Sequence, residues 1–580
     1  MIMRVFRNGS KRFKSFTPSA RRFARDEDGG VFTIFVLTGF IIIITLTGMG
    51  VDMMHFERDR ANLQATLDRA VLAAADLDQE LPPAEVVKDY FKKSGVRGRL
   101  TKEPAVTPGF GSRRVTAEAE TVVKTAFMYF AGIPELTASV TSTAEESVGA
   151  IEISLVLDMS GSMDDPSAEA GKDKIQVLRE AAKEFVTTMY EKENPEKISI
   201  SIVPYATQVN AGENILGNFT GVSNEHNYSH CVNFTGSQFK EHNVKPATVL
   251  ERTAHFDRYR SNNAAYQWEH NRRPTCPTRP GSEITPVTND ISELHGQIDA
   301  LTASGNTSID IGMKWAAALV DPAFQPIISK LANQKKDPDS DAEDAPTVVP
   351  KEFANRPKEY TSDVQKVIIV MTDGYNTSQW KLRSSLRSGN SPVWYNPNYS
   401  QQESRYNWDT ERWETVTVQG EYSVRMSTNP NRYYWSRQER WNMDHRFGDR
   451  DSEDGTAVRL TYPELFALTS LRWNALNNFY PWDGSALSDW YSNAYSSVSR
   501  STKNTRTNDI CSAIKNKGVL VYGIAFEAPD AGLTTIENCA TKPSMVYEVN
   551  STGNLGDENL TLEEAFRSIA SSIKRLRLTQ

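Results

Sequence analysis

The chain has 580 residues, which is too long for one ordinary domain and enough to bury two or three hydrophobic cores. Its formal net charge is -8, with 73 acidic residues against 65 basic ones, and the basic residues are scattered except at the extreme N-terminus. A chain with this balance has no electrostatic attraction to a phosphate backbone, which disfavours a nucleic-acid-binding function.

The first segments of the chain predict a membrane anchor. Residues 1–30 form a basic segment, rich in Lys and Arg, and residues 31–51 that follow carry no charge. An uncharged helix of that length is roughly 30 Å long, which is the thickness of a bilayer core. The basic segment is then cytoplasmic, and in a bacterial cell the bulk of this single-pass inner-membrane protein lies in the periplasm. The alternative is a cleaved secretory signal, whose apolar run of about 7 to 15 residues would be shorter.

The next segments predict a helix and a small module outside the membrane. Apolar residues between positions 63 and 74 recur at helical spacing, so we expect the anchor helix to continue as a helical stalk over 52–80. Residues 84–148 contain a helical pattern and then alternating apolar and polar stretches, which are typical of half-exposed strands. This region therefore predicts a small α+β module.

Four apolar runs rich in β-branched residues predict the main domain. They are IEISLVL (151–157), ISISIVPYA (198–206), KVIIVMTDG (366–374) and GVLVYGIAF (518–526). Helical patterns lie between them, and buried strands that alternate with helices form an α/β fold with a doubly wound, mainly parallel sheet, as in Rossmann-like proteins. We therefore expect one such domain over 150–580, with long insertions at about 210–285 and 378–505.

Five oxygen-bearing side chains lie near the predicted carboxyl ends of these strands. Asp158, Ser160 and Ser162 follow the first strand at alternate positions, Asp373 closes KVIIVM, and Thr307 lies in the loop TASGNTSIDIG between them. Ligands of doubly wound sheets bind at this edge. Carboxylates and hydroxyls are hard oxygen ligands, suited to Mg²⁺ or Mn²⁺ rather than zinc or copper. We assign the five residues to a metal site and none of them to catalysis.

The trio DMSGS, the threonine of SGNT and TDG after an apolar strand together resemble a known metal site. They are similar to the metal-ion-dependent adhesion site (MIDAS) of von Willebrand factor A-type domains. The resemblance implies that Ser160, Ser162 and Thr307 bind the metal directly, while Asp158 and Asp373 mainly hold bound waters. It also implies that an acidic residue of a protein partner completes the coordination.

The N-terminal part resembles a second family. DEDGGVFTIFVLTGF and GVDMMHFERDRANLQATLDRAVLAAAD are similar to the membrane-anchored start of TadG-type proteins of the tight-adherence (Flp) pilus assembly system. ICSAIKNKGVLVYGIAF and EEAFRSIASSIKRLRLTQ near the C-terminus also resemble that family. Pilins carry a glutamate at the fifth position after a processing glycine, whereas Phe35 stands there after Gly30. We therefore expect assembly or anchoring machinery and not a fibre subunit.

All four cysteines lie beyond the predicted membrane span, where an oxidising compartment permits disulfides. Proximity in the sequence favours pairing Cys231 with Cys276 and Cys511 with Cys539, although three pairings are possible. Isolated buried thiols are the alternative, and a zinc site is disfavoured because no CxxC spacing occurs.

The insertion at 378–505 holds nine of the eleven tryptophans of the chain. Aromatic rings interleaved with Asn, Ser and Arg are typical of surfaces that bind partners. They are equally consistent with a small core of the insertion's own, so the sequence leaves both interpretations open.

Three functions remain open. We favour a membrane-anchored, non-enzymatic component of Flp/Tad-type pilus assembly or cell adhesion, which binds an acidic residue of the pilus machinery or of a surface ligand through the MIDAS metal. The second is a structural envelope anchor with a non-functional metal site. The third is an enzyme with Asp158 as nucleophile, which we disfavour because phosphatases of that type carry a second aspartate two residues on, where this chain has Ser160.

Overall fold

The structure is a computed structural model that describes residues 30–76, 79, 81–109, 112–147, 150–191, 194–258, 271–342, 344–361, 364–407, 412–549 and 560–578. Apart from Gly30, the predicted basic segment 1–30 lies outside the described residues. The chain divides into two compact units, Met1–Val148 and Gly149–Gln580, called here the first and the second unit.

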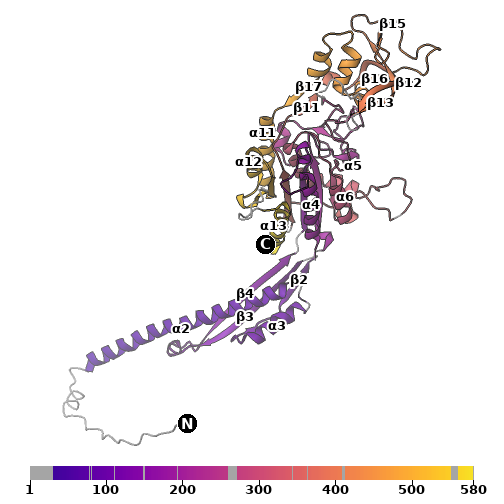
Figure 1. Ribbon diagram of the computed structural model, residues 1–580. Helices are drawn as coiled ribbons and strands as arrows, with labels where there is room; N and C mark the ends of the chain where they lie inside the picture. Colours follow the sequence, from indigo (N-terminus) through magenta and orange to yellow (C-terminus); the bar gives the residue numbers. More distant parts are fainter. Residues whose placement is uncertain are drawn as a thin grey trace. The chain divides into compact units, whose positions relative to one another are not determined.

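One continuous helix, α2 (Gly30–Ala75), runs through the first unit (Figure 1). It covers the whole uncharged run and continues beyond it. The apolar side chains of its first half are exposed, with Val31 at 81% and Phe35 at 76%. By length and composition, α2 could cross a membrane.

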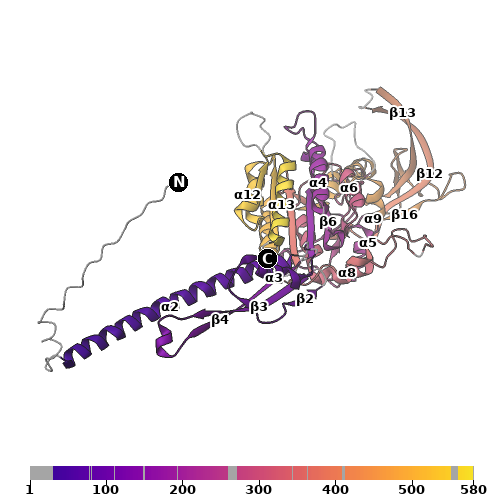
Figure 2. The ribbon, with the colours of Figure 1, turned by 90° about the horizontal axis from the view of Figure 1, so that it is seen from below.

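A small α+β layer packs against the second half of α2. It consists of α3 (Pro83–Ser94), β1 (Arg99–Leu100), β2 (Ala105–Gly109), β3 (Ser112–Lys124), the short helix η2 (Met128–Ala131) and β4 (Glu135–Ser147). The long strand β3 pairs antiparallel with β4 along one edge and with β1 and β2 along the other. Leu63 and Leu67 of α2 share one buried cluster with Val87 of α3 and Val115 of β3. Figures 1 and 2 show β3 and β4 lying alongside the helix.

A six-stranded sheet forms the centre of the second unit, in the order β19-β18-β10-β5-β6-β9. Its strands are β5 (Ala150–Asp158), β6 (Ile198–Tyr205), β9 (Thr285–Thr288), β10 (Val364–Thr372), β18 (Leu520–Phe526) and β19 (Val546–Val549). All neighbouring strands are parallel except β6 and β9, which are antiparallel. The four apolar runs of the sequence correspond to β5, β6, β10 and β18, so the predicted doubly wound, mainly parallel sheet is confirmed.

Two buried clusters, one on each face of the sheet, hold the helices in place. Alternate residues of β5 enter different clusters, Leu155 one and Val156 the other, because successive side chains of a strand point to opposite faces. The cluster with Leu155 includes residues of α4 (Lys174–Tyr190), α6 (Ile291–Asp299) and α13 (Leu562–Leu578). The cluster with Val156 includes residues of α5 (Gly212–Leu216), α7 (Ile309–Val320), α8 (Gln325–Leu331), α11 (Arg500–Lys515) and α12 (Asp530–Cys539).

Both disulfides lie in the second unit. Cys231 pairs with Cys276 across a Cα–Cα distance of 5.7 Å, close to the short hairpin of β7 (Val232–Asn233) and β8 (Glu251–Arg252). Cys511 of α11 pairs with Cys539 of α12 across 5.0 Å. This is the pairing that proximity in the sequence favours.

The tryptophan-rich stretch folds around a core that also includes Ala254 and Phe256. Trp380, Tyr422 and Trp473 belong to one buried cluster there, whereas Trp413 and Trp441 are exposed at 69% and 48%. Most of the described rings therefore serve packing. Its strands and α-helices are β11 (Gln379–Leu382), β12 (Asn390–Asn407), β13 (Arg412–Arg425), β14 (Tyr433–Trp435), β15 (Arg440–Met443), β16 (Val458–Thr461), α9 (Tyr462–Leu468), α10 (Leu471–Trp473) and β17 (Tyr495–Val498).

Candidate metal site at the carboxyl edge of the sheet

Asp158 is the last residue of β5, and its side chain is fully buried. One carboxylate oxygen, Oδ1, accepts a hydrogen bond from the Ser160 N–H at 2.8 Å. The other, Oδ2, accepts from the hydroxyls of Tyr205 at 3.1 Å and Thr372 at 2.7 Å. Because Tyr205 ends β6 and Thr372 ends β10, three neighbouring strand ends fix the position of this carboxylate.

A chain of polar contacts leads from Asp158 to the second acidic residue. The hydroxyls of Ser160 and Ser162 lie 3.2 Å apart, and the Ser162 hydroxyl donates to Asp373 Oδ1 at 2.7 Å. The other oxygen of Asp373 accepts from Lys174 Nζ at 3.1 Å, near the start of α4. Four of the five predicted residues, Asp158, Ser160, Ser162 and Asp373, therefore belong to one hydrogen-bonded group.

In the described residues, Thr307 makes no hydrogen bond to this group, although its loop contacts the loop after β5. The Gly161 N–H donates to the Gly305 carbonyl at 2.9 Å, two residues before Thr307. A Cβ on Gly161 would lie 3.2 Å from that carbonyl oxygen, and Gly305 has a φ of +90°. A Cβ on Gly305 would instead lie 2.9 Å from Thr207 Oγ1, and its positive φ is one that other residues rarely adopt, so glycine favours this arrangement of the loops.

Lys503 of α11 supports the Thr307 loop from the protein interior. Its ammonium donates to the carbonyl oxygens of Thr307 at 2.6 Å and Thr377 at 2.8 Å, and to the Ser308 hydroxyl at 2.6 Å. Asp310 Oδ1 lies 3.9 Å away. Burial lowers the pKa of Lys503 to about 8. Lys503 lies near the end of the insertion 378–505 and thus connects that end to the loop that carries Thr307.

Burial makes the two carboxylates at this edge costly to ionise. Desolvation and, second, the charge of Asp373 raise the pKa of Asp158 to about 7. Desolvation also raises the pKa of Asp373, although the nearby Lys174 ammonium opposes that shift. Two buried carboxylates linked to the hydroxyls of Ser160 and Ser162 are the hard oxygen donors that Mg²⁺ or Mn²⁺ prefers, so these four residues fit such an ion.

A site made only of His, Cys, Asp or Glu is not found here. Within the residues that the structure describes, no three such side chains come together in a way that could hold a metal ion. A metal at the sheet edge would therefore depend on hydroxyl oxygens as well as on the two acids.

Three residues that contact the two acids, Tyr205, Thr372 and Lys174, were not expected from the sequence. The parallel register places Tyr205 opposite Asp158, so the end of the second predicted strand could have pointed to it. Thr372 adjoins Asp373 in the TDG motif, but its contact with Asp158 follows only from the strand pairing. Lys174 comes twelve residues after Ser162 and carries no signal of its role.

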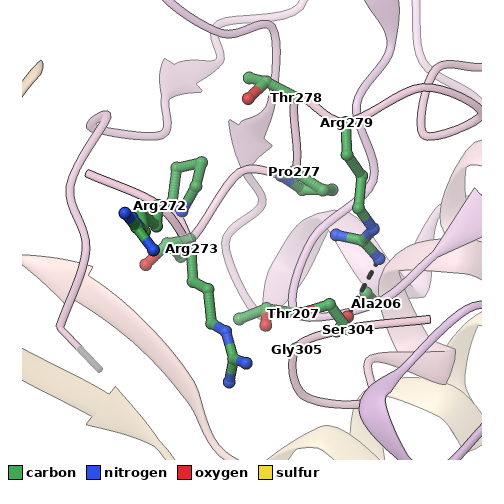
Figure 3. Close-up of a pocket in the computed structure, with 11 residues that line it drawn as sticks. Ala206, Thr207, Arg272, Arg273, Pro277, Thr278, Arg279, Ser304 and Gly305 are labelled. Carbon is green, nitrogen blue, oxygen red and sulfur yellow. Dashed lines mark hydrogen bonds between the residues drawn. The ribbon is translucent and has the colours of Figure 1, made fainter. Parts of the chain in front are cut away.

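A cavity of about 150 Å³ lies beside the candidate site (Figure 3). The residues that line this cavity include Thr207, Ser304, Gly305, Arg272, Arg273 and Arg279. Arg279 donates to the carbonyl oxygens of Met159 and Ser304, each at 3.0 Å, and therefore connects the loop after β5 to the loop before Thr307. Three arginines make the cavity basic, and Ser304 and Gly305 of the loop before Thr307 line it.

Comparisons with known proteins bear on both units. The model of the Tad family, described as "Putative Flp pilus-assembly TadE/G-like", matches residues 30–77. No curated protein sequence matches the chain.

Several solved structures of pilus proteins are similar to the chain. The pilus adhesin SpaC from Lactobacillus rhamnosus GG has 11% identity and a TM-score of 0.26, with 82% of this chain and 34% of that one covered. The chain thus spans about a third of the SpaC structure. The vWF domain of the type V pili tip protein Mfa5 from Porphyromonas gingivalis has 13% identity and a TM-score of 0.29, with 74% of this chain and 96% of that one covered. The adhesive tip pilin GBS104 from Group B Streptococcus agalactiae has 13% identity and a TM-score of 0.27, with 70% of this chain and 99% of that one covered.

We base the fold on the strand order and not on these similarities. The second unit contains the six-stranded sheet and the helices on both of its faces. The strand-end motifs DMSGS, SGNT and TDG belong to the same unit. Residues 30–77 therefore match the TadE/G-like Tad model, and the second unit has a doubly wound, mainly parallel sheet with helices on both faces.

Proposed function

We propose that the second unit binds Mg²⁺ or Mn²⁺ at Asp158, Ser160, Ser162, Thr307 and Asp373 and uses the ion to bind an acidic residue of a protein partner. The hydrogen bond from Ser162 to Asp373 carries this proposal, because it joins two strand-end loops, 211 residues apart in the sequence, into one group. The serines and the threonine bind the ion directly, and the two acids act mainly through bound water. The ion supplies positive charge that a partner's carboxylate neutralises.

The Tad domain supplies the cellular setting for this proposal. The protein is a component of Flp/Tad-type pilus assembly or of adhesion, anchored in the inner membrane by α2, with its bulk in the periplasm. The apolar length of α2 and the two disulfides support this placement. The partner is a protein of the pilus machinery or a surface ligand.

The surroundings of Asp158 favour binding over catalysis. A nucleophilic carboxylate needs access to its substrate, whereas this side chain is fully buried and accepts hydrogen bonds from three donors. We therefore propose no enzymatic step at this residue.

One observation favours a second candidate function. The Lys174 ammonium already lies 3.1 Å from Asp373 Oδ2 and supplies positive charge to the site without a metal. If that pairing replaces the ion, the second unit serves as a structural part of an envelope anchor.

Calorimetric titration of Mg²⁺ and Mn²⁺ into the full-length protein in detergent tests the first function. The variant Ser160→Ala/Ser162→Ala loses two ligands, whereas Ser384→Ala/Ser385→Ala removes two exposed hydroxyls from the same unit and serves as the matched control. We expect the wild type and the control to bind the ion, and the first variant to bind at least about tenfold more weakly, as expected for one lost contact of 1.4 kcal/mol or more. Thermal melting verifies that all three proteins are folded.

The same variants then decide between the two functions in cells. Lost attachment or pilus assembly in the Ser160→Ala/Ser162→Ala strain, with normal protein levels, supports metal-dependent binding. Normal attachment in that strain, together with no metal binding by the wild type, would leave the structural anchor.

A further inference from the structure

We propose that the connection between β3 and β4, residues 125–134 and called here the β3–β4 tip, is a membrane-contact site. It would place Tyr129 and Phe130 in the headgroup region of the bilayer that α2 crosses. This inference rests on the proposed anchor role of α2 and adds a second point of contact between the first unit and the lipid.

The β3–β4 tip is fixed to α2 by a buried carboxylate. Asp52 is 3% exposed and accepts hydrogen bonds from three successive main-chain N–H groups, those of Ala126 at 3.0 Å, Phe127 at 2.7 Å and Met128 at 2.7 Å. One turn earlier, a Cβ on Gly48 would lie 2.2 Å from the Phe127 ring, so the glycine admits that ring against the helix. The tip is thus held at a defined level of α2.

That level is the end of the uncharged run. Residues 31–51 carry no charge, and Asp52 is the first charged residue after them. Gly48 and Asp52 are about 6 Å apart along the helix axis, so the two attachment points lie on either side of the boundary between hydrocarbon and headgroups. Figures 1 and 2 show the connection between β3 and β4 beside α2, with the N-terminal part of the helix extending past it.

The surface of the β3–β4 tip suits a lipid interface. Residues 125–134 contain no charged side chain, and Lys124 and Glu135 flank them. Phe130 is 80% exposed, Tyr129 62% and Ile133 40%. Aromatic rings are enriched where a membrane meets water, because their apolar body and polar tip match that region. An aromatic loop fixed at this level therefore contacts lipid headgroups.

Site-specific fluorescence on the full-length protein tests this inference. All four cysteines form disulfides, so one introduced cysteine can be labelled selectively with an NBD dye. Phe130→Cys and Tyr129→Cys report on the tip. Phe40→Cys lies in the uncharged run and reports on the anchor. Leu72→Cys is the matched control, since Leu72 is 65% exposed on the same helix. The labelled proteins are reconstituted into phosphatidylcholine and phosphatidylglycerol vesicles, with nitroxides on the headgroups for the labels at 129, 130 and 72 and on the acyl chains for the label at 40, which lies about 15 Å inside the bilayer.

We expect headgroup nitroxides to quench the labels at 129 and 130 at least about threefold more than the label at 72, which lies about 30 Å further along α2. Quenching at 40 with no excess at 129 or 130 would overturn the inference and leave the anchor intact. Blue-shifted emission at 130 without quenching by lipid would mean that protein covers the tip, which also overturns it. No quenching at 40 would overturn the anchor and this inference together.

Discussion

Replacing Asp158 by asparagine should stabilise the metal-free protein at pH 8. Burial and the charge of Asp373 raise the pKa of Asp158 from 3.8 to about 7. The difference corresponds to about 4 kcal/mol that the ionised carboxylate costs the folded state above pH 7. Asparagine keeps an acceptor for the Ser160 N–H but loses the two bonds to Oδ2, at about 1 kcal/mol each. Asp158→Asn should therefore be about 2 kcal/mol more stable in EDTA at pH 8.

The sign of this effect should depend on pH. Because the pKa of Asp158 is higher in the folded state than in the unfolded state, the unfolded chain loses the proton first as pH rises. The metal-free wild type therefore loses stability relative to the variant between about pH 4 and pH 7. Near pH 4 the variant should be no more stable than the wild type. Asp158 of the folded wild type is then protonated, so mainly the hydrogen bonds that the variant lacks affect the difference in stability.

Urea denaturation, followed by tryptophan fluorescence at pH 4, 6 and 8, measures both effects, with Asp341→Asn as an exposed control that changes the charge equally. At pH 8, Mg²⁺ at a hundred times its Kd should stabilise the wild type by about 2.7 kcal/mol and Asp158→Asn by about 1.4 kcal/mol or less, as for a site at least about tenfold weaker. A variant that is less stable than wild type in EDTA at pH 8, or that responds to Mg²⁺ as wild type does, would refute the reasoning.

Three further changes test the supporting structure. Lys174→Ala should tighten Mg²⁺ binding about threefold to tenfold in low salt, because its ammonium pairs with an acidic side chain of the site at 3.1 Å; an unchanged titration would contradict this. Gly305→Ala should cost about 1–3 kcal/mol in urea denaturation, since φ is +90° there, and wild-type stability would count against the need for glycine. Cys511→Ser/Cys539→Ser opens a loop with a sequence separation of 28 and should cost about 3.5 kcal/mol by the chain-entropy estimate; a cost below about 1 kcal/mol would show that α11 and α12 hold together without it.

The central sheet could be predicted because its strands are buried on both faces. Such strands need continuous apolar runs, and Leu155 and Val156 pack into different clusters as that rule requires. The strand-end position of Asp158 and Asp373 followed from the same pattern. The aromatic stretch could not be divided into core and surface, because its rings show no regular period; Trp473 proves buried and Trp413 exposed.

Contacts between distant segments could not be predicted. Lys174 meets Asp373 across 199 residues, and Lys503 meets Thr307 across 196. Nothing in the local sequence of either lysine marks it, since a lysine near the start of a helix is ordinarily solvated. Which cation faces which carboxylate is decided by the packing of α4 and α11 on the sheet.

The contact of Arg279 with the two loops of the candidate site depends on a nearby disulfide. Arg279 follows three residues after Cys276, whose disulfide to Cys231 anchors the segment that carries it. In a compartment that keeps thiols reduced, this segment lacks its covalent anchor and the brace between Met159 and Ser304 loses its support. Reduction of the Cys231–Cys276 disulfide should therefore loosen the contact of Arg279 with both loops, and reoxidation should restore it.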